Sequence, residues 1–208
     1  MPSPAVRRLS LYLRQLEAFL ADHRRTVSSK QLGEALGLSD AQVRKDLAYF
    51  GQFGQAGIGY RVPDLIGRIR RIFGTDKVAN ILLAGVGNLG RALLLFRGFA
   101  PRGFDIVAAF DNDPAKIGME IGGPGAVRVQ PLSEMGAVTR ARSIRVGIVA
   151  VPAFAAQSVA DEMVAVGIRG ILNFAPIQLQ IASHVAVSSV DLAVHLEQLS
   201  FLTHDTET

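Results

Sequence analysis

The sequence predicts an α/β protein in which a winged helix-turn-helix domain precedes a doubly wound parallel sheet and a C-terminal helix. Three patterns predict this fold class: two short capped helices in the N-terminal third, continuous apolar runs separated by helical patterns after residue 77, and an apolar helix at the end. We expect residues 1–77 to form the first domain, residues 78–188 the second, and residues 189–208 a C-terminal dimerisation helix and tail.

Composition excludes several classes of protein. The 208-residue chain is 49% hydrophobic and 19% charged, which provides enough apolar material for a packed core. It has no cysteine and four scattered histidines, so disulfides and thiolate metal sites are excluded and we expect no metal. No apolar run reaches the roughly 18 residues of a membrane span, and the N-terminus lacks the apolar core of a signal peptide. We therefore expect a cytoplasmic protein without a membrane partner.

Positive charge is concentrated in the first domain. Residues 1–77 hold 13 Lys and Arg against 7 Asp and Glu, whereas the remainder holds 9 against 11. A basic small domain attached to a weakly acidic larger one favours a polyanionic partner such as nucleic acid. The alternative is a basic surface that is only solvated.

The first domain begins with a helix. Ser3 and Pro4 form a typical helix start, because proline at the first helical position has no N–H to leave unpaired. Apolar residues then recur at helical spacing to about residue 21. These are Val6, Leu9, Leu13, Leu16 and Leu20.

Two further helix starts share one pattern, a serine followed by a glutamine three residues later. In this capping box the serine accepts a bond from the helix backbone and the glutamine bonds back to the cap. We therefore expect short helices at about 29–36 and 40–50, joined as a helix-turn-helix. The residues are Ser28 with Gln31 and Ser39 with Gln42, and Gly37 between them provides the left-handed helix end.

The second of these helices has the features of a DNA-reading helix. Its spacing buries Val43, Leu47 and Phe50 and places the cations Arg44 and Lys45 on the opposite face. Small residues beside these cations, Ala41 and Ala48, let a helix approach the major groove closely. The alternative is a solvated helix face.

The segment Phe50–Val62 is rich in glycine and carries aromatic residues, so we expect a hairpin that forms the wing and lies along a minor groove. A fourth helix should follow at about 64–73. The predicted DNA contacts are Ser39, Gln42, Arg44, Lys45, Tyr49, Phe53 and Tyr60.

After residue 77 the periodicity changes. The runs VANILLAG, FDIVAAFD, IRVGIVAV and IRGILNFA are continuously apolar, which is typical of strands buried on both faces of a parallel sheet. Helical patterns separate them, so a doubly wound sheet is expected.

A glycine-rich turn follows the first of these strands and opens a helix, the context that a Rossmann-type dinucleotide site requires. The glycines allow a tight turn, a close approach to a pyrophosphate and close packing of helix on strand, and the helix N-terminus attracts phosphate. The second strand ends at Asp111, where a carboxylate accepts hydrogen bonds from the adenosine ribose and disfavours a 2′-phosphate, so NAD(H) is the expected cofactor. The alternative is a packing turn with a solvated acid. The loop residues are Gly85, Val86, Gly87, Asn88, Leu89 and Gly90.

Two further strand ends border the same expected crevice, because ligands of open α/β sheets bind at the carboxyl ends of the strands. The prolines in these segments are also ordinary strand terminators, which is the alternative. The residues expected near the nicotinamide are Val151, Pro152, Ala153, Asn173, Phe174 and Ala175.

The last helix, about 190–203, is apolar on more than one side, so we expect it to be covered, either by a second subunit or by its own domain. No residue pair suited to hydride-transfer chemistry is evident, and His184 and His195 have no evident partner. We therefore expect no catalytic residue, and a dinucleotide that acts as a signal.

Several strings of this sequence are specific enough to indicate a family. They are RRLSLYLRQLE (Arg7–Glu17), QVRKDLAYFGQFGQAGIGY (Gln42–Tyr60), GVGNLGRAL (Gly85–Leu93), FDNDPAKIG (Phe110–Gly118), GILNFAP (Gly170–Pro176) and DLAVHLEQLSF (Asp191–Phe201). Through them the chain resembles the bacterial redox-sensing repressor family Rex. The resemblance implies a homodimer that binds a palindromic double-stranded operator, with C-terminal helices swapped between the Rossmann domains. It also implies that NADH binding releases DNA, whereas NAD⁺ permits DNA binding.

One position departs from that family. Members often have a tyrosine in the helix after the glycine loop, which is thought to couple the nicotinamide state to domain orientation together with an arginine and an acid. The matching positions here are Phe96, Arg14 and Asp191, and Phe96 has no hydroxyl. Two other functions stay open: a small NAD-dependent oxidoreductase with an N-terminal interaction domain, and a CoA-binding module.

Overall fold

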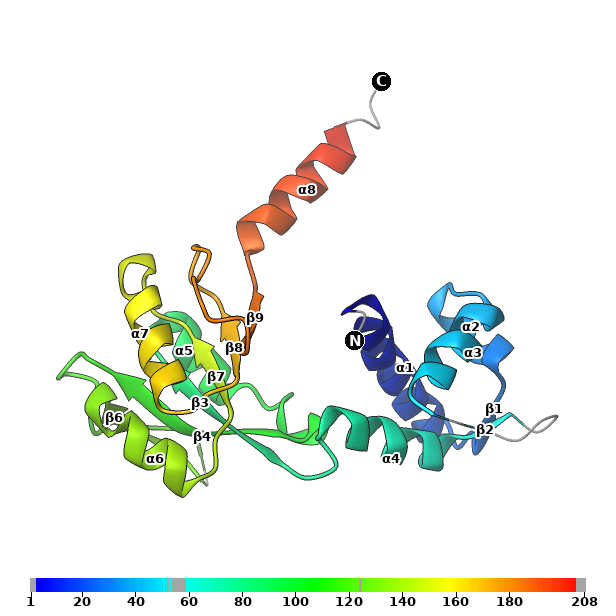
Figure 1. The fold of residues 1–208 in the computed structure, drawn as a ribbon, viewed down its shortest axis with the longest axis horizontal. Coiled ribbons are helices and arrows are strands. Elements are labelled where there is room, and N and C mark those ends of the chain that lie inside the picture. Colours follow the sequence, from blue (N-terminus) through cyan, green and yellow to red (C-terminus); the bar gives the residue numbers. More distant parts are fainter. Residues whose placement is uncertain (1–2, 52, 54–58, 124, 205–208) are drawn as a thin grey trace. The chain divides into compact units, whose positions relative to one another are not determined.

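The computed structural model describes residues 3–51, 53, 59–123 and 125–204 (Figure 1). The chain divides into two compact units, Met1–Lys77 and Val78–Thr208. Within the described residues no helix is long and apolar enough to cross a membrane.

The described residues of the first unit form four helices and a two-stranded sheet. Its core lies between the helices and includes Leu9, Leu32, Val43, Leu47 and Ile69, all at most 1% exposed. The elements in chain order are α1 (Ser3–Ala21), β1 (Thr26–Val27), α2 (Ser29–Leu36), α3 (Asp40–Tyr49), β2 (Tyr60–Arg61) and α4 (Val62–Phe73).

The predicted helix-turn-helix is confirmed at its caps. The Ser28 side chain accepts from the Gln31 backbone while the Gln31 side chain accepts from Ser28, so the capping box of α2 is complete. Ser39 accepts from the Gln42 backbone at the start of α3. Gly37 ends α2 with a φ of 67°, the left-handed conformation that favours glycine.

The buried face of α1 differs from the predicted one. Leu9 and Leu16 are buried as expected, but Val6, Leu13 and Leu20 are only half-buried. The face is completed by Ala5, Tyr12 and Phe19. Tyr12 can be buried because its hydroxyl donates to the buried carboxylate of Asp46.

The described end of the glycine-rich segment is a short strand that pairs outside the segment. The strand at the end of that segment, β2, pairs antiparallel with β1, which precedes α2. Gly59 makes this pairing possible, because its φ is 84° and a Cβ there would lie 2.6 Å from the Val27 carbonyl oxygen. Residues 52 and 54–58 of the expected hairpin lie outside the described residues.

The second unit is a seven-stranded sheet in the order β5-β6-β4-β3-β7-β8-β9, parallel except for the β5–β6 pair. This confirms the doubly wound prediction. Its strands are β3 (Ala79–Ala84), β4 (Phe104–Asp111), β5 (Glu120–Ile121), β6 (Val127–Pro131), β7 (Val146–Val149), β8 (Gly170–Asn173) and β9 (Ala186–Ser189). Its helices are α5 (Asn88–Leu95), α6 (Met135–Ala141), α7 (Ala153–Ala165) and α8 (Leu192–His204), with short 3-10 turns at Ala100–Arg102 and Leu132–Glu134.

Helices cover both faces of the sheet (Figure 1). On one face Met135 of α6 and Met163 of α7 belong to a cluster with Leu82 and Phe110. On the other face Leu93 of α5 packs in a separate cluster on the opposite side of β3. The strands between these layers are therefore covered from both sides.

The last helix, α8, has no buried residue within the chain. Leu192, Leu196, Leu199 and Leu202 are 58–67% exposed, and Phe201 is 66% exposed. We expected this helix to be covered either by a second subunit or by its own domain. In the described residues it is not covered by its own domain.

Candidate nucleotide cleft and nucleic-acid interface

In the glycine loop after β3, Gly85 and Gly90 are required by close packing within the protein and Gly87 is not. Gly85 has a φ of 96°, and a Cβ there would lie 2.4 Å from the Ala150 carbonyl oxygen. Gly90 packs so closely that a Cβ would lie 1.9 Å from the Gly85 carbonyl oxygen. Gly87, the N-cap of α5, is open, with no atom within 4 Å of the position a Cβ would take. The loop is thus closed on the protein side and open where a phosphate would approach.

Asp111 stands at the end of β4 beside this loop. Its Oδ2 accepts from the Val86 backbone N–H at 2.7 Å and from Lys116 Nζ at 3.1 Å, and its Oδ1 accepts from the Asp113 backbone N–H at 2.9 Å. Burial opposes the charge of this carboxylate, but the three hydrogen bonds outweigh it and its pKa lies below the ordinary value. Asp111 is therefore an ionised acceptor that also fixes the loop.

A cleft of about 330 Å³ opens at the carboxyl ends of β3, β4 and β7. This lies where the strand order reverses, the usual ligand position in an open α/β sheet. Five of the predicted cofactor residues line it. They are Gly85, Gly87, Asp111, Val151 and Pro152.

The other loop residues surround the cleft without lining it. Val86 is 1% exposed and packs inward, while Asn88 and Leu89 are exposed in the first turn of α5. Gly90 is buried, and Ala153 begins α7. Their contribution is to build the loop and the two helix starts.

Asn173 bonds to its own loop within the described residues, and its contact with the cofactor stays a prediction. It is fully buried, its Nδ2 donates to the carbonyls of Ala175 and Ile177, and its Oδ1 accepts from the Ala175 N–H. The side chain thus holds the loop after β8. Phe174 is half-buried in the apolar cluster on the face of the sheet that α5 covers, and Ala175 is buried.

Eight residues that line the cleft were not predicted, among them Lys116 and Phe154. Lys116 lines the cleft and pairs with Asp111, and Phe154 is 90% exposed at its edge. The signal for Lys116 was available, because it lies five residues after the strand-ending acid in the string FDNDPAKIG. No pattern marks an exposed phenylalanine in a helix as a cleft residue.

The faces of α3 are those predicted. Val43 and Leu47 are buried and Phe50 is half-buried, whereas Arg44, Lys45 and the two small alanines are exposed. Tyr49 is 57% exposed, with its ring edge-on to Phe50.

Arg44 has partners on its own surface. Its Nη1 lies 2.5 Å from Asp40 Oδ2 and 3.3 Å from Ser29 Oγ. The hydrogen bond from Arg44 holds the pKa of the Asp40 carboxyl below its ordinary value. Since both side chains are about half exposed, this ion pair is weak and can give way to a phosphate or a base.

Three predicted contact residues also have structural partners. Ser39 caps α3, and the Phe53 ring packs against the domain core with the Arg68 guanidinium 5.7 Å from its centroid. Tyr60 is half-buried in β2, where burial raises its pKa. Any DNA contact from Phe53 or Tyr60 would come from a partly covered ring.

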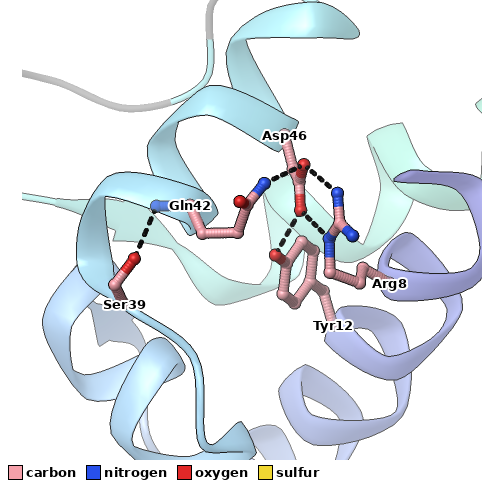
Figure 2. Close-up of polar contacts among 5 residues, drawn as sticks. All are labelled: Arg8, Tyr12, Ser39, Gln42 and Asp46. Carbon is pink, nitrogen blue, oxygen red and sulfur yellow. Dashed lines mark hydrogen bonds and ion pairs between the residues drawn. The ribbon is translucent and has the colours of Figure 1, made fainter. Parts of the chain in front are cut away.

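A buried acid on α3 was missed altogether. Asp46 is 3% exposed and lies against α1, where Arg8 donates to it through Nε at 2.5 Å and Nη2 at 2.8 Å. Tyr12 donates its hydroxyl at 2.7 Å and Gln42 its amide at 2.8 Å (Figure 2). The charge of this acid is therefore fully compensated, and the cluster ties the two helices together.

The three proposed coupling residues are spread over both units. Arg14 is exposed on α1. Phe96 caps the end of α5, is 57% exposed, and lies edge-on to Phe99 at 4.9 Å between ring centroids. Asp191 accepts from the N–H groups of Ala193 and Val194 and so caps α8.

Comparison with known proteins agrees with this architecture. Residues 1–48 match the family model described as "Putative DNA-binding protein N-terminus", and residues 76–177 match the model described as "CoA binding domain". The fold and the cleft together define the class: a regulator with a helix-turn-helix domain and a dinucleotide-type α/β domain.

Curated relatives identify the family within this class. The redox-sensing transcriptional repressors Rex of Pelotomaculum thermopropionicum and Desulforamulus reducens are 49% and 47% identical, over 97% of this chain and 93% and 94% of theirs. The chain belongs to the Rex family of redox-sensing transcriptional repressors.

Solved structures agree over the full length. A structure of the Rex-family repressor RSP with β-NAD⁺ and operator DNA matches at a TM-score of 0.92 and 34% identity, covering 100% of this chain and 94% of that one. A structure of RSP with β-NADH matches at 0.86 and 32%, covering 100% and 96%.

Proposed function

We propose that the chain is a transcriptional repressor that binds a palindromic operator and senses the cellular NADH/NAD⁺ ratio, with NADH binding causing release of DNA. One observation carries the proposal: a single chain holds both a cation-bearing α3 and a glycine loop closed by an ionised acid. The relatives are named as redox-sensing repressors, and the RSP structures contain NAD⁺ with operator DNA and NADH. A protein that binds chromosomal operators works in the cytoplasm of a bacterium.

The cofactor follows from the cleft. Gly87 leaves room for a pyrophosphate at the start of α5, where backbone N–H groups and the helix dipole attract its charge. Asp111 is ionised and retains acceptor capacity on Oδ1 for ribose hydroxyls, and its charge disfavours a 2′-phosphate. NAD(H) is therefore favoured over NADP(H) as the regulatory ligand, and we assign no catalytic residue.

Release of DNA requires two arrangements of the chain. A ligand shifts an equilibrium only by its differential affinity, so NADH must bind the DNA-incompetent arrangement more tightly than the competent one. The coupling positions are Arg14, Asp191 and Phe96. Because Phe96 offers only a ring, its contribution is packing, where a tyrosine would also donate a hydrogen bond.

Dimerisation through α8 completes the proposal. A palindromic operator needs two copies related by two-fold symmetry. The leucine face of α8 is 58–67% exposed within the chain, so a second copy provides the cover that its own domain does not. Exchange of α8 between the two Rossmann domains is the arrangement we propose.

A gel shift tests the function. The full chain should retard a duplex carrying a selected palindrome, and NADH should remove the shifted band where NAD⁺ leaves it in place. A band unaffected by saturating NADH would refute redox sensing. Absence of any sequence preference would refute the repressor assignment.

The match to the CoA binding domain model favours one alternative ligand. A titration monitored by the fluorescence of NADH distinguishes NADH from CoA as the ligand. A saturable enhancement of NADH fluorescence that CoA does not reverse supports NADH, and competition by CoA at equal concentration would support the alternative.

The oxidoreductase alternative predicts turnover of alcohols or hydroxy acids with NAD⁺, which we expect to be undetectable.

A further inference from the structure

The guanidinium of Arg44 on α3 is held at one nitrogen. Its Nη1 donates to Asp40 Oδ2 at 2.5 Å, one turn earlier on the same helix, and to Ser29 Oγ at 3.3 Å, on α2. Nη1 carries two N–H groups, and the structure gives it these two acceptors. Both helices of the helix-turn-helix therefore hold the same nitrogen of Arg44.

The other edge of this guanidinium stays available. Arg44 makes no hydrogen bond through Nε or Nη2 to the residues that the structure describes. These two nitrogens form a planar fork of N–H donors, which matches a pair of acceptors. In the major groove such a pair is O6 and N7 of guanine. Arg44 can thus contact a guanine in two places while Nη1 remains on Asp40.

Asp40 lies where DNA would approach α3. It is the first residue of the helix, and the N-terminal residues of a recognition helix are those that contact base edges. Its carboxyl is ionised, because the hydrogen bond from Arg44 holds its pKa below the ordinary value. The side chains of Arg44 and Asp40 are 56% and 45% exposed, so both charges are open to DNA that binds this face.

The negative charge of Asp40 distinguishes two uses of Arg44. An arginine that leaves Asp40 for a phosphate leaves an unpaired carboxylate close to a polyanion, and like charges across an interface are unfavourable. An arginine that contacts guanine through Nε and Nη2 keeps its ion pair, so the carboxylate stays compensated. The exposed pair adds little to folding stability, but it penalises the first binding mode and not the second.

We propose that Asp40, together with Ser29, is a positioning residue that presents the Nε–Nη2 edge of Arg44 to a guanine and disfavours the use of Arg44 as a phosphate contact. Asp40 thereby lowers the affinity for DNA of any sequence and raises the preference for the operator. The inference rests on the proposed DNA-binding function and names how one side chain distinguishes a base from the backbone.

The first experiment compares two duplexes of equal length, the motif that full-length wild type selects from a random pool and a scrambled version of it. Asp40→Asn removes the charge at nearly constant size. It should bind the scrambled duplex about 3- to 10-fold more tightly, the effect of one exposed charge interaction in each of two copies. The affinity for the selected motif should rise less, so the ratio of the two affinities falls. No gain on the scrambled duplex, or a gain at least as large on the selected motif, would overturn the proposal.

Salt dependence identifies the new phosphate contact, which a purely structural role of Asp40 would not create. Each phosphate that a cation neutralises steepens the dependence of log affinity on log salt concentration by about 0.9. Asp40→Asn should steepen the slope on the scrambled duplex by about 0.9 for each copy whose Arg44 is released to a phosphate. A slope equal to that of wild type would overturn the proposal.

Two further variants are matched controls. Glu34→Gln on α2 also removes one exposed acid from an i,i+4 pair, the pair with Lys30, but leaves the partners of Arg44 in place. Asp40→Glu keeps a carboxylate within reach of Arg44 four residues later. Both should retain the wild-type ratio and slope. A fall in the ratio equal to that of Asp40→Asn in either control would overturn the proposal.

The second experiment identifies the base. Full-length Arg44→Ala, which retains Lys45, is used in the same selection, and the base pair whose preference disappears is the Arg44 contact. We expect guanine there, and 7-deazaguanine, which lacks the N7 acceptor, should weaken wild-type binding about 3- to 10-fold without affecting Arg44→Ala. A motif identical to that of wild type would overturn the inference alone. A wild type that enriches no motif would refute the repressor function itself, and the inference with it.

Discussion

Asp111 illustrates how one residue can shape a loop and bind a ligand. Its Oδ2 is occupied by Val86 N–H and Lys116, while Oδ1 accepts only the Asp113 N–H among the described residues. A ribose hydroxyl can therefore bind Oδ1 without displacing the bond that holds the glycine loop.

Replacement Asp111→Ala should weaken NADH binding at least tenfold, because a charge-assisted hydrogen bond is worth about 1.5–3 kcal/mol. Tolerance of NADPH should rise, since the repelling charge is gone. Fluorescence titration with both nucleotides measures this. Asp113→Ala, which removes the more exposed neighbour, is the control and should change NADH affinity little. Equal NADH affinity in wild type and Asp111→Ala would contradict the assignment.

The two cations of α3 should dominate DNA affinity. Arg44→Ala combined with Lys45→Ala is expected to abolish operator binding and leave NADH binding intact, because both side chains are exposed and the Arg44–Asp40 pair contributes little to folding. Gel shifts and NADH titration of the same sample give both results. Lys30→Ala, an exposed cation on α2, should retain the shift. Operator binding by the double variant would show that α3 is not the reading helix.

At this scale the sequence identified the exposed residues better than the buried polar ones. Arg44 and Lys45 could be placed from helical spacing alone. Asp46 and Tyr12 are 34 residues apart, and nothing in the local pattern shows that α1 and α3 bring them together. For the same reason Asn173, which ends a strand as a ligand residue would, could not be recognised as a residue that holds its own loop.

Among the elements, the glycine loop permits a paired prediction. Gly87→Ala should keep the free energy of unfolding within about 1 kcal/mol of wild type, because nothing lies near its Cβ position, yet it should lose NADH affinity because the methyl group occupies the approach of the phosphate. Thermal melts and NADH titration together measure this. A variant with unchanged affinity would place the phosphate elsewhere.

Gly90→Ala is expected to behave differently. Its Cβ would lie 1.9 Å from the Gly85 carbonyl oxygen, so helix α5 must shift and the protein should lose about 1–3 kcal/mol of stability. Denaturant unfolding measures the loss, and an unchanged midpoint would contradict the close packing of α5 on β3. This second variant distinguishes damage to the loop from blockage of the site.

The hydrogen bonds from Arg8 and Tyr12 of α1 to Asp46 of α3 predict a pH dependence of stability. The folded pKa of Asp46 is depressed, so its contribution to stability is fully present above the unfolded value of about 3.9 and is lost as pH falls through the folded value. The stability gap between wild type and Asp46→Asn should therefore narrow below about pH 4. Urea unfolding at neutral and acid pH measures the gap. A gap that is the same at both would show that the charge of Asp46 does not stabilise the fold.

Elements with strong local signals could be predicted and others could not. The caps of α2 and α3 and the continuous runs of β3, β4, β7 and β8 follow from short-range pattern. The strands β5 and β6 are only 2 and 5 residues long, and α6 only 7, which is too little for a periodicity to develop. The pairing of β2 with β1 depends on contact across two helices, which spacing does not encode.

For the whole molecule, the two binding functions must be linked in both directions. If NADH lowers operator affinity by some factor, operator DNA must lower NADH affinity by the same factor. Titrating NADH into free protein and into protein saturated with operator should give dissociation constants whose ratio equals the fold-change in DNA affinity. Unequal factors would mean that the measured states are not those of one linked equilibrium.

The exposed leucine face of α8 has a consequence for how gene control scales with dosage. If only the dimer binds the operator, operator occupancy rises with the square of monomer concentration when the chain is scarce. It levels off once the chain is abundant. A cell that makes few copies would then leave its target genes on even when fully oxidised. Transcription of the target genes would then depend on the concentration of the repressor as well as on the NADH/NAD⁺ ratio.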